Sequence, residues 1–228
     1  MLDKKFVISL GGSIAFPEKI NISFLKSFSL FIKKEIKKGY KFLIVVGGGE
    51  ITRRYQEAAG KITRVTDEDK DWIGIHATRL NAHLLRTILK RKAHPVVFDQ
   101  RFKIKDFGKY SLIIGSGWRP GWSTDYVAVQ IAVDLKIKIV INLTKIDYLY
   151  TADLKKEPKA KPIEKISWEE YRRLIPKKWT PGLHVPIDPI AAKLAQKEKI
   201  RVIIAQGENL KNLKNILKGK KFKGTIIE

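Results

Sequence analysis

Three glycine-rich segments, each directly after a short apolar run, are the features of this sequence best suited to hold an anionic ligand. They are Gly11-Gly12-Ser13, Gly47-Gly48-Gly49 and the segment 115–121. Glycine lets the backbone adopt positive φ and lets N–H groups approach an anion closely. A helix that begins at such a turn adds the positive end of its dipole. One such turn has a purely steric explanation, but three together predict a site for more than one phosphate group.

None of the three turns matches a common nucleotide motif. The P-loop spacing Gly-x-x-x-x-Gly-Lys-Ser/Thr and the dinucleotide fingerprint Gly-x-Gly-x-x-Gly are both missing. Asp71 and Asp125 each precede a helical stripe, so either could act in a site or serve only as a helix cap. His76 and His83 have no acidic cluster nearby in the sequence and are interpreted as structural. The sequence therefore predicts phosphate binding on another fold, with no metal site made of protein ligands alone.

The elements that must position these turns alternate along the chain. Strand-like apolar runs and segments of helical period follow one another, as in an α/β fold with a largely parallel sheet. Strands are expected at 6–10, 42–46, 95–98, 112–114, 137–143, 202–204 and at the end of the chain. Helices are expected at 23–36, 50–59, 73–88, 126–135, 189–197 and 210–217, and a surface loop at 154–162. We predict one domain, residues 1–228, built as a three-layer αβα sandwich.

Composition limits the class of protein. The chain has 228 residues, 44% of them hydrophobic and none of them cysteine, which excludes a disulfide scaffold and cysteine metal sites. No apolar run approaches the roughly 20 residues that span a bilayer. The first residues show no signal-peptide pattern. A soluble protein without a membrane partner, located in the cytoplasm, is expected.

The charge is strongly unbalanced. Lys and Arg number 46 against 23 acidic residues, a net charge of +23. Such an excess is typical of proteins that bind nucleic acid, membrane surfaces or anionic substrates, but also of chains with a generally lysine-rich surface. A positive field around a cleft would help to capture two polyanions. The sequence has no helix-turn-helix, zinc-finger or RNA-recognition motif, so nucleic acid is not an expected partner; a clustered basic face outside the cleft would favour it.

Taken in order, these segments resemble the amino-acid-kinase family and, within it, the archaeal-type uridylate (UMP) kinases. The resemblance extends over nearly the whole chain. It is carried by the segments 9–13, 46–55, 71–81, 120–125, 144–153 and 187–193. It implies transfer of a phosphoryl group from ATP, with Mg²⁺, to UMP in pyrimidine nucleotide biosynthesis, and a homohexamer. It also implies that the N-terminal part binds the acceptor nucleotide and the C-terminal part ATP.

The resemblance also implies roles for individual residues. Those implied to bind ATP are Gly12, Ser13, Gly49 and Arg53 on its phosphates, and Thr144, Lys145, Tyr150 and Asp153 on its adenosine. Those implied to bind UMP are Gly48, Asp71, Trp118, Arg119, Pro120, Gly121, Trp122, Ser123 and Thr124. Asp125 would organise the transfer site. Because the acceptor is already an ionised phosphate, this chemistry needs positioning and charge stabilisation more than a strong base.

The sequence departs from the family pattern at several positions. Many members have a lysine where this chain has Ser9; Lys193 is our candidate for the missing cation, with Lys4 and Lys5 as alternatives. Tyr148 replaces a glycine of the nucleotide loop, and the segment 179–186 differs from its usual form. Two other functions therefore stay open. One is a kinase of the same fold for isopentenyl phosphate or an amino acid, and the other is a non-catalytic nucleotide-binding regulator.

Overall fold

The fold is built around one seven-stranded sheet with helices on both faces. A computed structural model describes residues 4–152, 157–180, 183 and 185–228. The strands of this sheet are β1 (Lys5–Leu10), β2 (Lys41–Val46), β3 (Leu112–Gly115), β4 (Ile139–Thr144), β7 (Lys165–Ile166), β8 (Arg201–Gln206) and β9 (Thr225–Ile227). Their order is β3-β2-β1-β4-β8-β9-β7. A second, two-stranded sheet pairs β5 (Leu149–Tyr150) with β6 (Pro162–Ile163).

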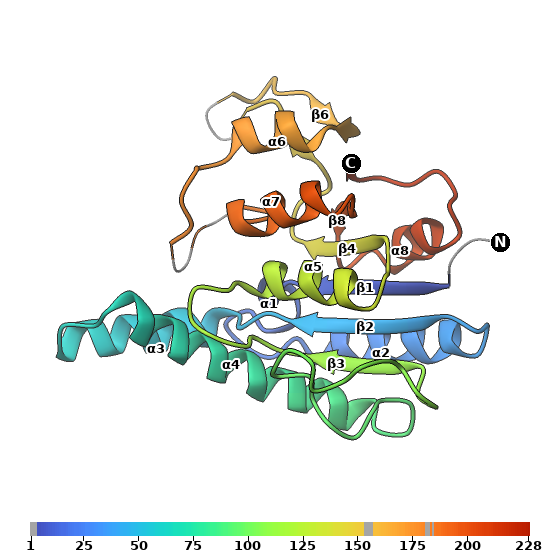
Figure 1. Ribbon diagram of the computed structural model, residues 1–228, viewed down its shortest axis with the longest axis horizontal. Coiled ribbons are helices and arrows are strands. Elements are labelled where there is room, and N and C mark those ends of the chain that lie inside the picture. Colours follow the sequence, from blue (N-terminus) through green and yellow to red (C-terminus); the bar gives the residue numbers. More distant parts are fainter. Residues whose placement is uncertain (1–3, 153–156, 181–182, 184) are drawn as a thin grey trace.

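The first five strands of the order run parallel. Lys5 pairs with Lys41, and the same register continues to Leu10 beside Val46. The order β3-β2-β1-β4-β8 is parallel throughout, whereas β9 runs antiparallel to β8. The carboxyl ends of the parallel strands therefore meet at one edge of the sheet, to which the arrowheads of β1 and β2 point in Figure 1. The loops that leave these ends carry the glycine turns.

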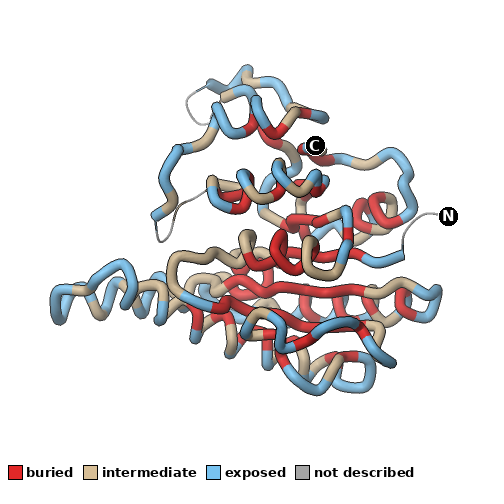
Figure 2. The backbone as a smooth tube through the Cα atoms, viewed as in Figure 1, coloured by how far each residue is buried: buried red, intermediate tan, exposed pale blue. Residues whose placement is uncertain are grey.

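Helices cover both faces of the sheet, and the apolar side chains between sheet and helices form a separate cluster on each face. The helices are α1 (Gly12–Ala15), α2 (Ile22–Ile36), α3 (Glu50–Ile62), α4 (Asp67–Ile88), α5 (Thr124–Asp134), α6 (Trp168–Leu174), α7 (Pro189–Lys197) and α8 (Leu210–Leu217). Side chains of α2, α4 and α8 pack on one face, and those of α5, α6 and α7 on the other. Figure 2 shows the buried residues concentrated in the sheet and on the helix sides that face it. Among the described helices, none is both long and apolar enough to cross a membrane.

The predicted fold class is confirmed, and so are most of the predicted elements. The helices expected at 189–197 and 210–217 have the predicted ends. The strand predicted at 95–98 is wrong: Phe98 makes only one bridge, to Gly115, because the segment crosses the sheet edge too briefly to form a ladder. Part of the loop predicted at 154–162 lies outside the described residues. The sequence analysis missed α1, α6 and the two-residue strands, which are too short to show a periodic pattern.

Candidate active site

The first two glycine turns touch each other where β1 and β2 end. The N–H of Gly47 donates to the carbonyl oxygen of Leu10 at 2.9 Å, and a Cβ on Gly12 would collide with the main chain of Gly49. Gly49 has φ of 72°, which a residue with a side chain rarely adopts. Glycine is therefore required here by close approach and by backbone conformation. The two turns form one continuous main-chain surface at the edge of the sheet.

Helix α4 holds the second and third turns in place. The side-chain amide of Asn81 donates to the carbonyl oxygens of Gly47 at 3.0 Å and Gly48 at 2.9 Å. The N–H of Gly117 donates to the hydroxyl of Thr78 at 2.8 Å. Because Thr78 and Asn81 lie three residues apart on one helix, they face the same side. One helix thus fixes two loops that are about 70 residues apart in sequence.

Asp71, near the start of α4, reaches the loop that follows β3. Its carboxylate accepts a 2.7 Å hydrogen bond from the N–H of Gly121. Burial raises the pKa of Asp71, with the nearby charge of Asp67 acting in the same direction and the Gly121 hydrogen bond against it. The role of Asp71 as a simple helix cap is wrong, because Thr66 caps α4 and Asp71 lies one turn into the helix.

These turns and helices enclose a cavity of about 260 Å³. Eight of the predicted site residues line it: Gly48, Gly49, Arg53, Asp71, Trp122, Ser123, Thr124 and Asp125. Eight lining residues were not predicted: Thr52, Gln56, Gly74, Ile75, Thr78, Gly117, Trp179 and Leu183. Thr52 and Gln56 lie four residues apart on α3, so the helical period after the second turn is a signal that could have found them. Trp179 comes from a distant segment and had no such signal.

Asp125 is the most perturbed group in the cavity. Its carboxylate accepts a 2.8 Å hydrogen bond from the hydroxyl of Ser9, at the position where many members of the family have a lysine. Burial raises the pKa of Asp125 from 3.8 to about 7; the charge of Asp188 adds to this, and the Ser9 hydrogen bond opposes it. The cap of α5 is Ser123, so Asp125 is free of a capping role.

Asp188 is a buried acid that the sequence analysis did not assign to the site. It is 4% exposed, and its carboxylate accepts hydrogen bonds from the N–H groups of Ile190 at 2.8 Å and Ala191 at 3.0 Å. It also accepts the hydroxyl hydrogen of Ser123. Burial raises its pKa, and these hydrogen bonds act against that rise. Asp188 therefore joins the cap of α7 to the start of α5, next to Asp125.

The two tryptophans of the loop after β3, Trp118 and Trp122, lie in different surroundings. Trp118 is 5% exposed, and its indole N–H donates to the carbonyl oxygen of Phe98 at 3.0 Å, so it packs in the core and does not line the cavity. Trp122 lines the cavity, and the Arg119 guanidinium lies 4.7 Å from its ring centre. Of the two tryptophans, only Trp122 can stack on a ligand in the cavity.

The predicted ATP-side residues lie along the ends of β1, β2 and β4. Gly12 and Ser13 begin α1, and Thr144 ends β4 beside Lys145, with Tyr150 in β5. The carbonyl oxygen of Thr144 accepts a 2.9 Å hydrogen bond from the N–H of Gly207. Asp153 lies outside the described residues.

Arg53 is exposed but already has an ionic partner. It is paired with Glu50, with a hydrogen bond of 2.9 Å from its Nε to the carboxylate. To bind a phosphate, its guanidinium must exchange or share this partner.

The three candidate cations do not reach the cavity. Lys193 is exposed on α7 and lines a different cavity with Arg172 and Lys177. Lys4 and Lys5 lie at the amino end of β1, and Leu10 is five positions further along the strand than Lys5, a distance of about 17 Å. The structure thus does not bring these lysines together with Asp125, because a strand separates Lys4 and Lys5 from it and α7 turns Lys193 outward.

A larger cavity of about 570 Å³ opens at the opposite edge of the sheet, beside Lys138, Trp168 and Arg201. Arg201 is ion-paired with Glu228 there. The features predicted to bind phosphate are at the smaller cavity, which two glycine turns, Asp71 and Asp125 line and which the first glycine turn adjoins, so we take the smaller cavity as the candidate site.

Comparison with known proteins identifies the family and the fold. The model of the amino acid kinase family matches residues 4–106 and 115–206. The chain is 33% identical to a uridylate kinase of Thermococcus kodakarensis, over 98% of this chain and 99% of that one, and 35% identical to one of Methanocorpusculum labreanum, over 98% and 95%. The crystal structure of uridylate kinase from Archaeoglobus fulgidus superposes with a TM-score of 0.81 at 30% identity, covering 98% of this chain and all of that one.

Proposed function

This chain belongs to the amino acid kinase family, and from that premise we propose that it is an enzyme that transfers the terminal phosphoryl group of ATP to UMP, giving UDP. The observation that carries the proposal is a cavity lined by the second and third glycine turns together with Asp71 and Asp125, with the first turn packed against the second at its edge. The full-length similarity to uridylate kinases favours UMP over isopentenyl phosphate or an amino acid as the acceptor. It also favours a catalyst over a non-catalytic regulator.

We assign the two nucleotides to the two halves of the site. UMP would lie against Gly48 and under the loop 117–124, with its ribose hydroxyls on Asp71 and its base on Trp122. The ATP phosphates would face the main chain of Gly12 and Gly49, where N–H groups can stabilise charge on the migrating group. The predicted adenosine contacts Thr144, Lys145 and Tyr150 lie in the C-terminal half, so the proposed division into an acceptor part and an ATP part would apply to the adenosine and not to the ATP phosphates.

Asp125 would position the reacting groups rather than remove a proton. The acceptor oxygen of UMP is already ionised, so its attack needs alignment with the phosphorus atom. A carboxyl group with a pKa of about 7 holds a proton for part of the time at neutral pH. In the protonated state Asp125 adds less negative charge to a site that must receive two polyanions. The hydrogen bond from Ser9 holds the Asp125 side chain in its orientation.

The residues present fit Mg²⁺ when it is carried by the nucleotide. Mg²⁺ keeps several water ligands and usually takes one or two carboxylates together with substrate phosphates. The described residues contain no group of three His, Cys, Asp or Glu side chains that could hold a metal. Asp125 would therefore be the main protein ligand in its ionised state, which the bound cation would favour, with Asp188 committed to its hydrogen bonds in the α7 cap. When bound, the ion would neutralise phosphate charge during transfer.

We also propose that the protein is a homo-oligomer. An apolar face is exposed on α3 and α4, where Tyr55 is 62%, Trp72 40% and Leu80 63% exposed. These side chains line a shallow cavity of about 370 Å³ with almost no polar surface. Exposed apolar patches of this kind mark contact sites between proteins. We place the enzyme in the cytoplasm, in pyrimidine nucleotide synthesis, and infer a hexamer from its family.

An ATP-consumption assay with Mg²⁺ tests the function. The acceptors are UMP, CMP, AMP, isopentenyl phosphate and free amino acids, each measured separately. We expect turnover with UMP well above all others. Turnover with another acceptor and none with UMP would overturn the assignment of the acceptor, and no turnover with any acceptor would overturn the assignment as a kinase.

A further inference from the structure

The excess positive charge of this protein lies away from the candidate active site. Loops leave the parallel strands at the cavity's edge of the sheet at 11–21, 47–53, 115–125, 144–148 and 206–211, and they hold five Lys or Arg residues and five acidic ones. At the opposite edge of the sheet, turns lead from a helix into the next strand at 33–41, 134–138 and 197–201. These turns hold ten Lys or Arg residues and three acidic ones. The expected positive field around the cleft is thus not where the surplus charge is found.

The densest part of this charge is one continuous patch. We call it the basic edge and define it by ten lysines at the ends of α2 and α8 and the starts of β1 and β2: Lys4, Lys33, Lys34, Lys37, Lys38, Lys41, Lys214, Lys218, Lys220 and Lys221. Specific contacts join its parts. The hydroxyl of Tyr40 donates to the carbonyl oxygen of Leu217 at 3.2 Å, and the ammonium of Lys4 donates to the carbonyl oxygen of Lys38 at 3.0 Å.

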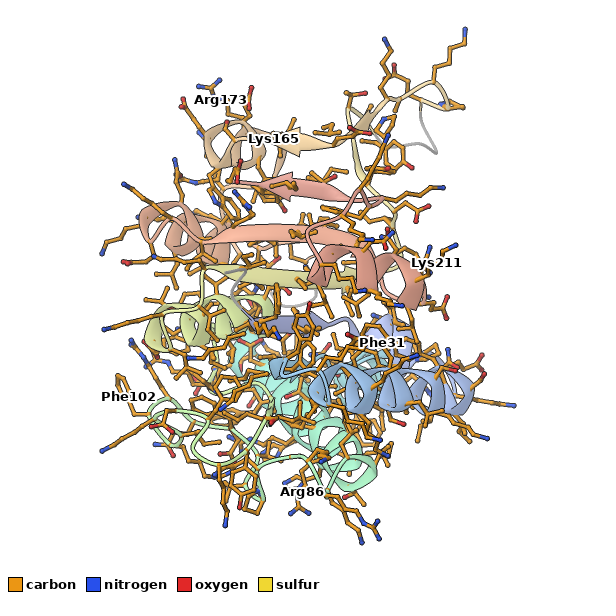
Figure 3. All side chains as sticks on the ribbon, turned by 90° about the vertical axis from the view of Figure 1, so that its right-hand side faces the viewer. Phe31, Arg86, Phe102, Lys165, Arg173 and Lys211 are labelled. Atoms are coloured by element: carbon orange, nitrogen blue, oxygen red, sulfur yellow. The ribbon has the colours of Figure 1, made fainter. Side chains whose placement is uncertain are left out.

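Figure 3 views the molecule from the right-hand side of Figure 1 and shows both α2, marked by Phe31, and α8, marked at its first turn by Lys211. The contacts of Tyr40 with Leu217 and of Lys4 with Lys38 join the ends of these elements. Far apart in the sequence, the two lysine-rich helix ends therefore form one surface. It is continuous with the first residues of the central strands.

The basic edge is barely neutralised within the protein. Glu35 is the only acidic residue in the segments 33–41 and 214–221, and it is buried and paired with Lys38 at 2.5 Å. In the described part of the chain, the other nine lysines form no ion pair within 4 Å. Lysines near a helix C-terminus are expected to complement its dipole, but that effect is confined to the last turn. It does not explain the lysines that begin the strands or those that follow α8.

Such crowding of like charges costs stability in the free protein, and a bound polyanion would relieve it. We propose that the basic edge binds the phosphate backbone of nucleic acid without sequence specificity. Every exposed large hydrophobic side chain of the described residues lies outside 33–41 and 214–221, so nothing on this surface would enter a bilayer. Lysine is a compact point charge suited to phosphates, and contacts to phosphates carry no sequence information. Double-stranded DNA has about one charge per 1.7 Å of axis, so one duplex can contact several of these lysines at once.

The test measures binding of a labelled, mixed-sequence DNA duplex by fluorescence anisotropy over a range of salt concentrations. The edge variant combines Lys34→Gln, Lys37→Gln and Lys218→Gln. The control variant combines Lys26→Gln, Lys61→Gln and Lys159→Gln, three exposed lysines elsewhere, so that both lose the same charge. We expect the wild type to bind with a steep salt dependence. The edge variant should lose at least about tenfold in affinity at low salt, and its slope of log K against log salt should fall by about 3.

The control variant should bind nearly as the wild type does, and the edge variant should keep its rate of UMP phosphorylation and its melting temperature without DNA. Equal losses in both variants would show that net charge alone is responsible and would overturn the proposal. So would an absence of DNA binding at low salt, or binding to phosphatidylserine vesicles without binding to the duplex. The kinase assay is independent of the basic edge, so failure of the one does not imply failure of the other.

Discussion

Replacing Asp125 with asparagine should raise stability and abolish activity at the same time. Asparagine keeps the shape of the side chain and can still accept the Ser9 hydrogen bond of 2.8 Å. It never ionises, so the variant avoids the cost of placing a charge in this partly buried position beside Asp188. The change therefore separates the role of the carboxylate in catalysis from its role in the fold.

The size of the effect on stability follows from the pKa of Asp125. Folding raises it from 3.8 to about 7, so between these values the folded state holds a proton that the unfolded state has released. The stability of the wild type therefore falls as pH rises through this range, by roughly 4 kcal/mol in total. About 2–3 kcal/mol of this loss of stability occurs between pH 5 and pH 8. The variant should gain that amount relative to the wild type over the same interval.

Denaturant unfolding of both proteins at pH 5 and pH 8, without nucleotides, measures the difference. Asp188→Asn is the matched control, because asparagine also caps helices and its neutral side chain should lower the pKa of Asp125. The rate of UMP phosphorylation by Asp125→Asn should fall about a hundredfold or more. A stability difference that is the same at both pH values would refute the argument from burial. An unchanged rate would remove Asp125 from the transfer site.

Further changes test the other parts of the site. Asp71→Ala should raise the dissociation constant for UMP about tenfold and spare ATP binding in separate calorimetric titrations; equal loss for both nucleotides would contradict its assignment to the acceptor. Gly12→Ala should lower the free energy of unfolding by about 2–3 kcal/mol through the collision with Gly49, whereas Gly60→Ala, on a helix with open space around it, should raise it by about 0.5–1 kcal/mol. A neutral Gly12→Ala in denaturant unfolding would argue against the close approach. Leu80→Glu should reduce the mass measured by light scattering to that of a smaller assembly or monomer, and an unchanged mass would place the subunit contact elsewhere.

Much of the fold could be predicted because its strands and helices carry strong periodic patterns. The run 42–46 is apolar throughout, as a strand covered on both faces must be, and the structure buries all of it. The failure at 95–98 has the opposite cause. Its apolar residues pair with the edge of the sheet at one or two positions only. A run of four apolar residues looks the same in the sequence whether it forms such isolated bridges or a full ladder.

The site was only partly predictable from the sequence. Glycine turns after strands indicate which edge of the sheet binds ligands, and the structure brings Gly48, Gly49, Asp71 and Asp125 together there. Sequence spacing does not reveal which way a side chain points. Trp118 faces the core although Trp122, four residues later, faces the cavity, because the segment between them is a loop and not a helix.

Asp188 shows a second limit of the sequence. Its part in the carboxyl cluster depends on contact between α5 and α7, which are distant in the chain. The distribution of lysines shows the same limit on a larger scale. They are scattered along the sequence, but the alternation of helix and strand brings many of them to one edge.

Helix α3 has no buried residue in this single chain. It nevertheless belongs to the candidate active site, because Gly49 caps it and it carries Arg53. In Figure 2 it extends from the body of the molecule with only half-buried and exposed backbone. A helix of 13 residues is barely stable in water on its own. In the proposed oligomer, another subunit would cover the apolar side of α3. Assembly would then stabilise this helix, which contributes residues to the candidate active site. Activity per subunit should then decline on dilution, by mass action, while the central sheet stays folded.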